Sequence, residues 1–113
     1  MKFTKDNALP FEWEGISGLA YSSKEDFSNA SAVVFEVTGT HGKVKTPVSD
    51  RVYYVLEGEG EFIIEDNIIP VSQSDVVIVP KNTPYDYRVQ EGKVMKLFLV
   101  HTPAYEETEE VRL

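Results

Sequence analysis

Short β-rich runs separated by turn residues begin at Ala32 and continue almost to the C-terminus of this chain. This pattern favours an all-β sandwich or barrel over an alternation of strands and helices. No window of helical length carries an apolar stripe at a spacing of three and four residues. The predicted strands are Ala32 to Val37, Arg51 to Leu56, Glu61 to Glu65, Asn67 to Val71, Asp75 to Val79, Tyr85 to Val89 and Lys93 to His101.

Turn residues divide these strands. The run from Glu57 to Gly60 contains two glycines, which tolerate positive φ, and predicts a tight hairpin. The pair Asp66-Asn67 predicts a second turn. Residues 11–30 are less regular: their apolar residues indicate a strand or arm that packs on the barrel, and residues 22–26 are compatible with a short helical turn.

Composition narrows the class of protein. A chain of 113 residues is long enough for one domain, and the absence of cysteine excludes disulfides and thiolate metal sites. The net charge of −8 disfavours nucleic acid and anionic membrane as partners. No stretch approaches the ~20 apolar residues of a membrane span, so we expect a soluble, cytoplasmic protein. The C-terminal glutamates predict a solvated tail, because packed like charges repel: Glu106, Glu107, Glu109 and Glu110.

Two stretches of the chain keep a characteristic spacing. The first contains Gly39, Lys45, Pro47, Arg51 and Gly58, and the second contains Ser74, Pro80, Asn82, Tyr85 and Val89. The runs Tyr-Val-Leu-Glu-Gly-Glu-Gly at residues 54–60 and Asp-Val-Val-Ile-Val-Pro at residues 75–80 accompany them. In spacing and in local sequence, residues 31–102 resemble the cupin family.

The resemblance implies a cupin-type double-stranded β-helix, or jelly-roll barrel, over residues 31–102. Residues 1–30 would then form a short N-terminal arm that packs on the barrel, and residues 103–113 an acidic tail. The residues that correspond to the family's metal ligands are Lys45, Pro47, Arg51 and Tyr85. Arg51 has no lone pair to offer and its charge repels a cation, so we expect no metal and no other cofactor.

Strand alternation predicts which side chains share the interior. If Arg51 points inward then Tyr53 does too, and Tyr85 and Tyr87 share one face of a later strand. Arginine suits a carboxylate or phosphate, whereas tyrosine faces suit sugars and other polar rings. We therefore expect a small anionic or saccharide-like ligand bound by Arg51, Tyr53, Tyr87 and Glu36.

Catalysis without metal is one hypothesis for this pocket. Lys45, with its charge disfavoured in a dry barrel, would act as base and Tyr85 as acid. Metal-independent sugar isomerases and epimerases of the superfamily look similar, although their inward histidine has no counterpart at the matching positions here. The alternatives are a ligand-sensing module without chemistry, or a closed core in which Arg51 pairs with Glu36 or another inward carboxylate.

Other residues leave open questions. His101 is predicted at the surface or at an interface. His41 lies in a Gly-rich turn and is either a plain loop residue or the missing base at the barrel mouth. Tyr53 and Tyr87 are equally compatible with core packing. The outward-facing residues of the Arg51 strand are apolar and need a cover, so we expect a homodimer, as the resemblance also implies.

Overall fold

The computed structural model describes residues 1–113, which form ten strands and two single 3-10 turns. The turns are η1 (Lys5–Asn7) and η2 (Glu107–Glu109). The strands are β1 (Leu9–Trp13), β2 (Ile16–Ala20), β3 (Ser31–Val37), β4 (Val44–Lys45), β5 (Asp50–Ile64), β6 (Asn67–Ser72), β7 (Val76–Val79), β8 (Tyr85–Arg88), β9 (Met95–Thr102) and β10 (Val111–Arg112). Neither 3-10 turn could span a membrane, and the structure has no other helix.

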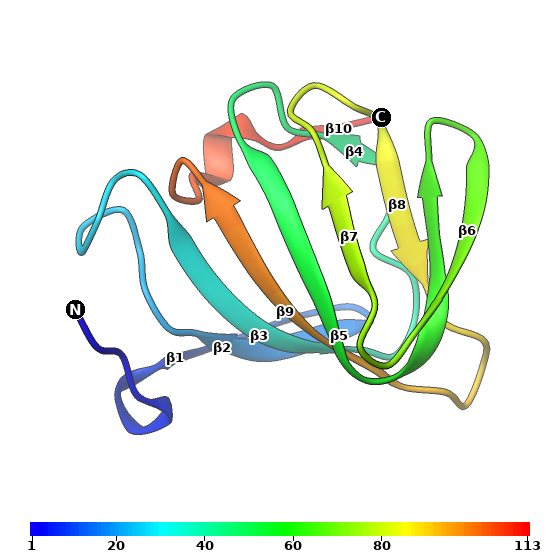
Figure 1. The fold of residues 1–113 in the computed structure, drawn as a ribbon, viewed down its shortest axis with the longest axis horizontal. Coiled ribbons are helices and arrows are strands. Elements are labelled where there is room, and N and C mark those ends of the chain that lie inside the picture. The colour runs from blue at the N-terminus through cyan, green and yellow to red at the C-terminus, as the bar shows by residue number, and fades with distance from the viewer.

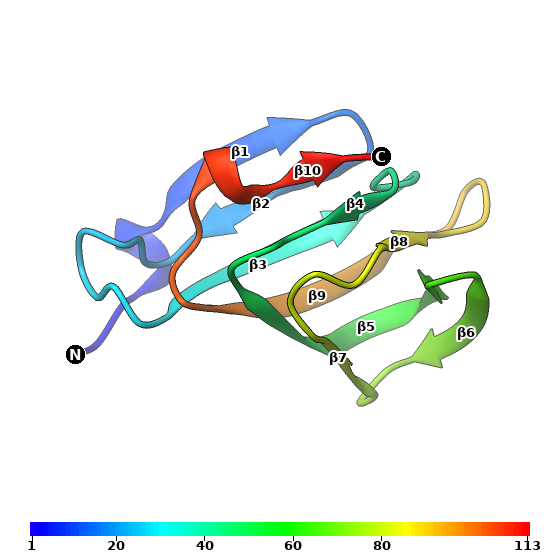
Figure 2. The same ribbon diagram turned by 90° about the horizontal axis from the view of Figure 1, so that it is seen from above.

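The strands form two antiparallel sheets that share β5, the longest strand. The first half of β5 pairs with β9 and β7, and β9 continues the sheet to β3, β2 and β1. The second half of β5 pairs with β6 and β8, and β8 leads to β4 and β10. Figures 1 and 2 show the sheets curling around a common interior. The predicted all-β jelly-roll barrel is confirmed.

The hairpin predicted at residues 57–60 is wrong, because β5 runs unbroken through them. The register shifts between Val55 and Glu57, and Gly58 adopts a φ of 81°. A Cβ atom on Gly58 would lie 2.1 Å from the Val94 carbonyl oxygen. These glycines therefore form a bulge with close backbone contacts, at which β5 passes from one sheet to the other.

The N-terminal residues extend the first sheet. The β1–β2 hairpin pairs with β3, and Gly18 stands in register between Phe11 and Phe35. The missing side chain of Gly18 lets the two rings approach to 6.4 Å between centroids. This hairpin closes one side of the barrel, the same side on which the C-terminal segment lies in Figure 2.

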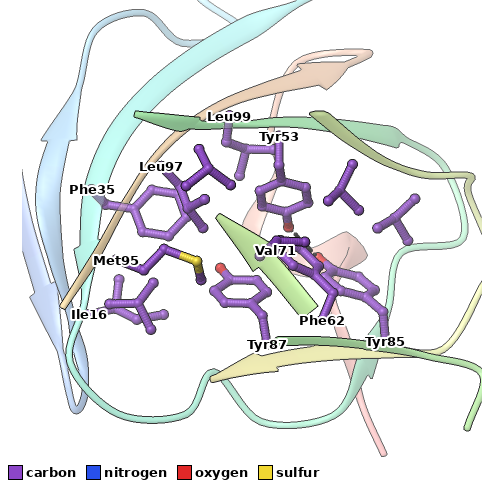
Figure 3. Packing of buried hydrophobic residues seen from close by; sticks show 14 of the residues in the cluster. Ile16, Phe35, Tyr53, Phe62, Val71, Tyr85, Tyr87, Met95, Leu97 and Leu99 are labelled. Carbon is purple, nitrogen blue, oxygen red and sulfur yellow. Dashed lines mark hydrogen bonds between the residues drawn. The ribbon is translucent and has the colours of Figure 1, made fainter. Parts of the chain in front are cut away.

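The core lies between the two sheets and is built from alternating positions of their strands. Arg51, Tyr53 and Val55 point inward from β5, as strand alternation predicts, and Tyr85 and Tyr87 point inward from β8. Figure 3 shows Met95 and Phe35 packing toward these rings. Each fully buried apolar side chain of this kind contributes about 1.5–3 kcal/mol to folding. The aromatic residues thus serve as core and as cavity wall together.

Candidate functional site

A cavity of about 200 Å³ lies inside the barrel, beneath the β1–β2 hairpin. Ten of its fourteen lining residues are hydrophobic: Phe11, Trp13, Ile16, Ala20, Val33, Phe35, Tyr53, Tyr87, Leu99 and Tyr105. The polar ones are His41, Arg51, His101 and Glu110. Ligand pockets are typically ~300–1,000 Å³, mostly apolar, with a few placed polar groups. This cavity therefore suits a compact ligand of one or two rings.

The hydrogen bonds of His41 show which of its two ring nitrogens carries the proton. It follows β3 in the loop that leads to β4, where its backbone N–H donates to the carbonyl of Tyr87. Its Nδ1 lies 2.9 Å from the Gly42 carbonyl oxygen. Because a carbonyl only accepts, Nδ1 carries the proton and Nε2 keeps its lone pair in the neutral ring. Nε2 faces Glu110, with 4.0 Å between Nε2 and Oε1.

The protonation state of His41 follows from its surroundings. Burial lowers its pKa below the ordinary value of 6.5, against the opposite effects of Glu110 and of the Gly42 carbonyl. The ring stacks on Tyr87 with 4.6 Å between centroids. At pH 7 His41 is therefore neutral, with a fixed tautomer and a free acceptor nitrogen on the cavity side. That is the arrangement of a general base.

Three core tyrosines lie beside His41, and two of them, Tyr53 and Tyr87, line the cavity. The Tyr53 hydroxyl donates to the Tyr85 hydroxyl over 3.1 Å, as the paired rings in Figure 3 show. Burial raises the pKa values of Tyr53 and Tyr87 well above that of a free phenol. Burial also raises the pKa of Tyr85, with Arg51 acting against it. All three hydroxyl groups stay protonated at neutral pH, and the proton of Tyr53 is already donated to Tyr85.

Arg51 is held by a carboxylate of the chain itself. Its Nη2 lies 3.4 Å from Oε1 of Glu109, and its Nε donates to Ser49 Oγ over 3.1 Å. Ser49 in turn donates to Glu109, and the Tyr105 ring lies 5.8 Å from the guanidinium carbon. The exposed fractions of the Arg51 and Glu109 side chains are only 3% and 6%. The guanidinium therefore reaches the cavity with its charge already neutralised.

His101 is a further polar residue of the cavity wall. Its Nδ1 lies 3.1 Å from Ser31 Oγ, which also accepts a hydrogen bond from the backbone N–H of Tyr105. Burial, together with the charge of Arg51, lowers the pKa of His101 to about 3. The predicted surface position of His101 is wrong, because its side chain points inward from β9 and is buried. His101 is thus a neutral polar group in the cavity wall.

The structure brings together some of the predicted site residues. Arg51, Tyr53 and Tyr87 line the cavity, and Tyr85 lies behind them in the core. Lys45 lies on the opposite face of β4 from the buried Val44 and does not line the cavity. Glu36 is exposed on the outer face of β3, in a separate groove, so it cannot pair with Arg51.

The residues at the positions that correspond to cupin metal ligands do not fit a metal ion. Around Lys45 and Pro47 the buried residues are Val44, Thr46 and Ser49, whereas Pro47 itself is exposed. The chain contains no group of three or more histidine, cysteine, aspartate or glutamate side chains that could hold a metal. The guanidinium of Arg51 occupies the interior instead. This donor set supplies too few lone pairs for a metal site.

Sequence reasoning missed two partly buried glutamates of the C-terminal segment, of which Glu110 lines the cavity. Glu109 and Glu110 have side chains that are 6% and 15% exposed, so the predicted solvated tail is wrong for these two residues. Glu106 and Glu107, by contrast, are exposed. The signal that could have found Glu109 is the inward guanidinium of Arg51, which needs a counter-charge because isolated buried charges are costly. Nothing local to the tail distinguishes its four glutamates.

Comparison with known proteins gives a family match and a set of similar structures. A family model described as a cupin domain matches residues 32–101. No curated protein matches the chain.

Among solved structures, the chain is similar to Pac13, described as a unique nucleoside dehydratase, of Streptomyces. The identity is 26%, the TM-score is 0.86, and the match covers 100% of this chain and 90% of Pac13. Structures of Pac13 variants, with one histidine changed to glutamine or one tyrosine to phenylalanine, are described with uridine.

Two further structures show likeness of fold. The polyketide cyclase RemF from Streptomyces resistomycificus is 14% identical, with a TM-score of 0.82 over 100% of this chain and 84% of RemF. KdgF from Halomonas sp. is 18% identical, with a TM-score of 0.78 over 96% of this chain and 97% of KdgF.

Proposed function

The chain belongs to the cupin family, and from this premise we propose that it binds a small uncharged ring compound, of the nucleoside or saccharide type, inside the barrel. The proposed chemistry is a metal-independent proton transfer through His41. The observation that carries this proposal is the neutral His41 ring. Its Nδ1 proton is held by the Gly42 carbonyl, and its Nε2 lone pair lies in a cavity walled by phenol hydroxyls.

The charge of the cavity favours a neutral ligand over an anionic one. Arg51 is the only lining residue with a permanent positive charge, and Glu109 already neutralises it. Glu110 adds a negative charge to the cavity wall. A carboxylate or phosphate would therefore compete with Glu109 and be repelled by Glu110. Of the two ligand types that the sequence predicts, we propose the saccharide-like one.

The likeness to Pac13 supports a nucleoside in particular. In the numbering of Pac13, its substituted histidine lies one position beyond the number of His41. Its two substituted tyrosines lie two positions beyond the numbers of Tyr53 and Tyr87. The match covers 100% of this chain, so these small offsets are those expected for equivalent positions. All three residues line the cavity here.

The arrangement can carry out proton abstraction next to a carbonyl group. The C–H bond breaks, Nε2 of His41 takes the proton, and the electron pair moves to the carbonyl oxygen, which a tyrosine hydroxyl stabilises by hydrogen bonding. Return of the proton to carbon at another position or face gives isomerisation or epimerisation. Expulsion of a β-hydroxyl group, which takes the proton from His41 and leaves as water, gives dehydration. Both outcomes share the first step.

Thermal-shift measurement of the chelator-treated protein tests the binding part. A ligand that binds only the folded state at 100 times its Kd stabilises that state by about 2.7 kcal/mol. We expect uridine, or a related nucleoside or sugar, to raise the Tm with and without chelator. Tyr87→Phe should weaken the shift, whereas Tyr21→Phe, outside the cavity, should not. A shift that appears only after metal is added would refute the proposal.

A non-catalytic binding module is the second candidate. It is favoured by the ion pair with Glu109, because an Arg51 that is already paired is less able to stabilise negative charge on a reacting ligand. The two candidates separate by NMR in deuterium oxide with a bound carbonyl-containing ligand. Catalysis predicts loss of a carbon-bound proton signal, abolished in His41→Gln. Unchanged signals with tight binding would leave only the binding module.

A further inference from the structure

The C-terminal segment, residues 105–113, lies across the cavity and supplies part of its wall. β10 pairs with β4, so that Arg112 stands opposite Val44, and the Leu113 N–H donates to the Lys43 carbonyl. Figure 2 shows this segment, coloured red, on the same side of the molecule as the β1–β2 hairpin. It lies beyond residues 32–101, which the cupin model matches. The segment is therefore an addition to the matched barrel that reaches into its cavity.

Glu110 is the residue of this segment that faces His41. Its Oε1 lies 4.0 Å from His41 Nε2 and 3.3 Å from Arg112 Nη2. Arg112 Nη1 donates to the backbone oxygen of His41 over 3.1 Å. Arg112 thus fixes the Glu110 carboxylate relative to the backbone of His41. The exposed fraction of the Glu110 side chain is 15%, so its charge is only partly screened by solvent.

The distance determines what this pair can do. At 4.0 Å the two side chains make no direct hydrogen bond, so a ligand hydroxyl or a water can contact both. The carboxylate has little interaction with neutral imidazole, but it attracts the imidazolium that forms when Nε2 takes a proton. Such an interaction favours the state reached during proton transfer over the resting state.

We infer that Glu110 is a positioning residue for His41. Glu110 supplies the counter-charge for the protonated His41 ring, and the C-terminal segment thereby completes the site. This inference rests on the proposed role of His41 as base. It assigns to the segment a chemical role in place of a solvated tail.

Other charged groups also face His41 and must be separated from Glu110. Asp86, from β8, accepts a hydrogen bond from the Gly42 N–H over 2.8 Å and favours the protonated ring. Arg112 favours the neutral ring, and the rings of Tyr85 and Tyr87 stack against it without charge. Of the two carboxylates, only Glu110 lines the cavity.

NMR titration of the His41 imidazole in the full chain tests the inference without any ligand. Loss of an opposite charge within about 4–6 Å shifts a pKa by about one pH unit or more. Glu110→Gln should therefore lower the pKa of His41 by about one unit, whereas Glu110→Asp should retain most of the wild-type value. Glu107→Gln, an exposed control in the same segment, should leave it unchanged. An unchanged pKa in Glu110→Gln, with the fold intact by NMR, overturns the inference.

A second measurement separates this inference from the proposed function. In deuterium oxide, the acidic limb of the pH profile of ligand proton exchange should move to lower pH in Glu110→Gln, with ligand binding retained. Nucleosides and sugars could bind and exchange their protons while Glu110→Gln moves neither the acidic limb of the pH profile nor the pKa of His41. In that case the inference alone fails. If they do not bind while Glu110→Gln lowers the pKa of His41, the proposed function fails and the charge pairing stands.

Discussion

Arg51 shows how far one residue can be interpreted from the sequence. The resemblance to cupins implies that its side chain lies inside the barrel, strand alternation predicts Tyr53 on the same face, and the structure agrees. Its partner, Glu109, lies 58 residues away in the chain, in a run of like charges that alone predicts exposure. Pairing across that separation depends on where the whole barrel places the C-terminal segment. Alternation within one strand is therefore predictable, whereas the identity of the buried counter-charge is not.

This ion pair allows a prediction about stability. Glu109→Gln leaves a buried guanidinium without its counter-charge and should destabilise the protein by about 3 kcal/mol, measured by urea unfolding. Glu106→Gln is the matched control: it breaks the exposed pair of Glu106 with Lys24 and should cost less than about 1 kcal/mol. Equal losses in the two variants would show that Arg51 does not depend on Glu109.

Among the elements, β5 departs furthest from the sequence prediction. The glycines of residues 57–60 predict a hairpin, because glycine with positive φ is common to tight turns and to bulges. Only the neighbouring strand distinguishes the two, through the approach of the Val94 carbonyl to Gly58. The strands around β5 were found because their alternating burial has a local signature. The bulge depends on contacts that are distant in sequence.

Gly58 offers a test with an internal control. Gly58 and Gly92 share a φ of 81°, but an added Cβ meets the Val94 oxygen at 2.1 Å in the first case and nothing within 4 Å in the second. Gly92→Ala should therefore cost about 1–2 kcal/mol, the strain of the left-handed backbone. Gly58→Ala should cost clearly more, measured by urea unfolding. A smaller loss at Gly58 would mean that the two sheets separate easily at the bulge.

The whole molecule has the dimensions of a single compact domain. Its radius of gyration is 13.3 Å, close to the ~13 Å expected for a domain of about this length. The outer face of the first sheet nevertheless exposes apolar side chains on neighbouring strands, among them Val76, Ile78, Tyr54 and Phe98. Tyr54 stands in register with both Val76 and Phe98, so these side chains form one patch. We expect a second copy of the chain to cover it.

Size-exclusion chromatography with light scattering, which measures the molar mass of the protein in solution, tests this expectation. The wild type should be a dimer, and Ile78→Lys should shift it to a monomer, because a charge within the patch would be desolvated in the interface. Ile68→Lys, on β6 of the other sheet and similarly exposed, should leave the dimer intact. A monomeric wild type at micromolar concentration contradicts the expectation.

Because β5 is continuous, the two sheets cannot separate from each other along this strand. One strand carries Arg51 and Tyr53 in the first sheet and pairs with the strand of Tyr85 and Tyr87 in the second, so this side is joined by covalent backbone. On the far side, β10 meets β4 through only two paired residues. We expect the barrel to open for ligand entry on that side, because so few paired residues hold β10 there. Entry of a ligand would then displace the segment that carries Glu110.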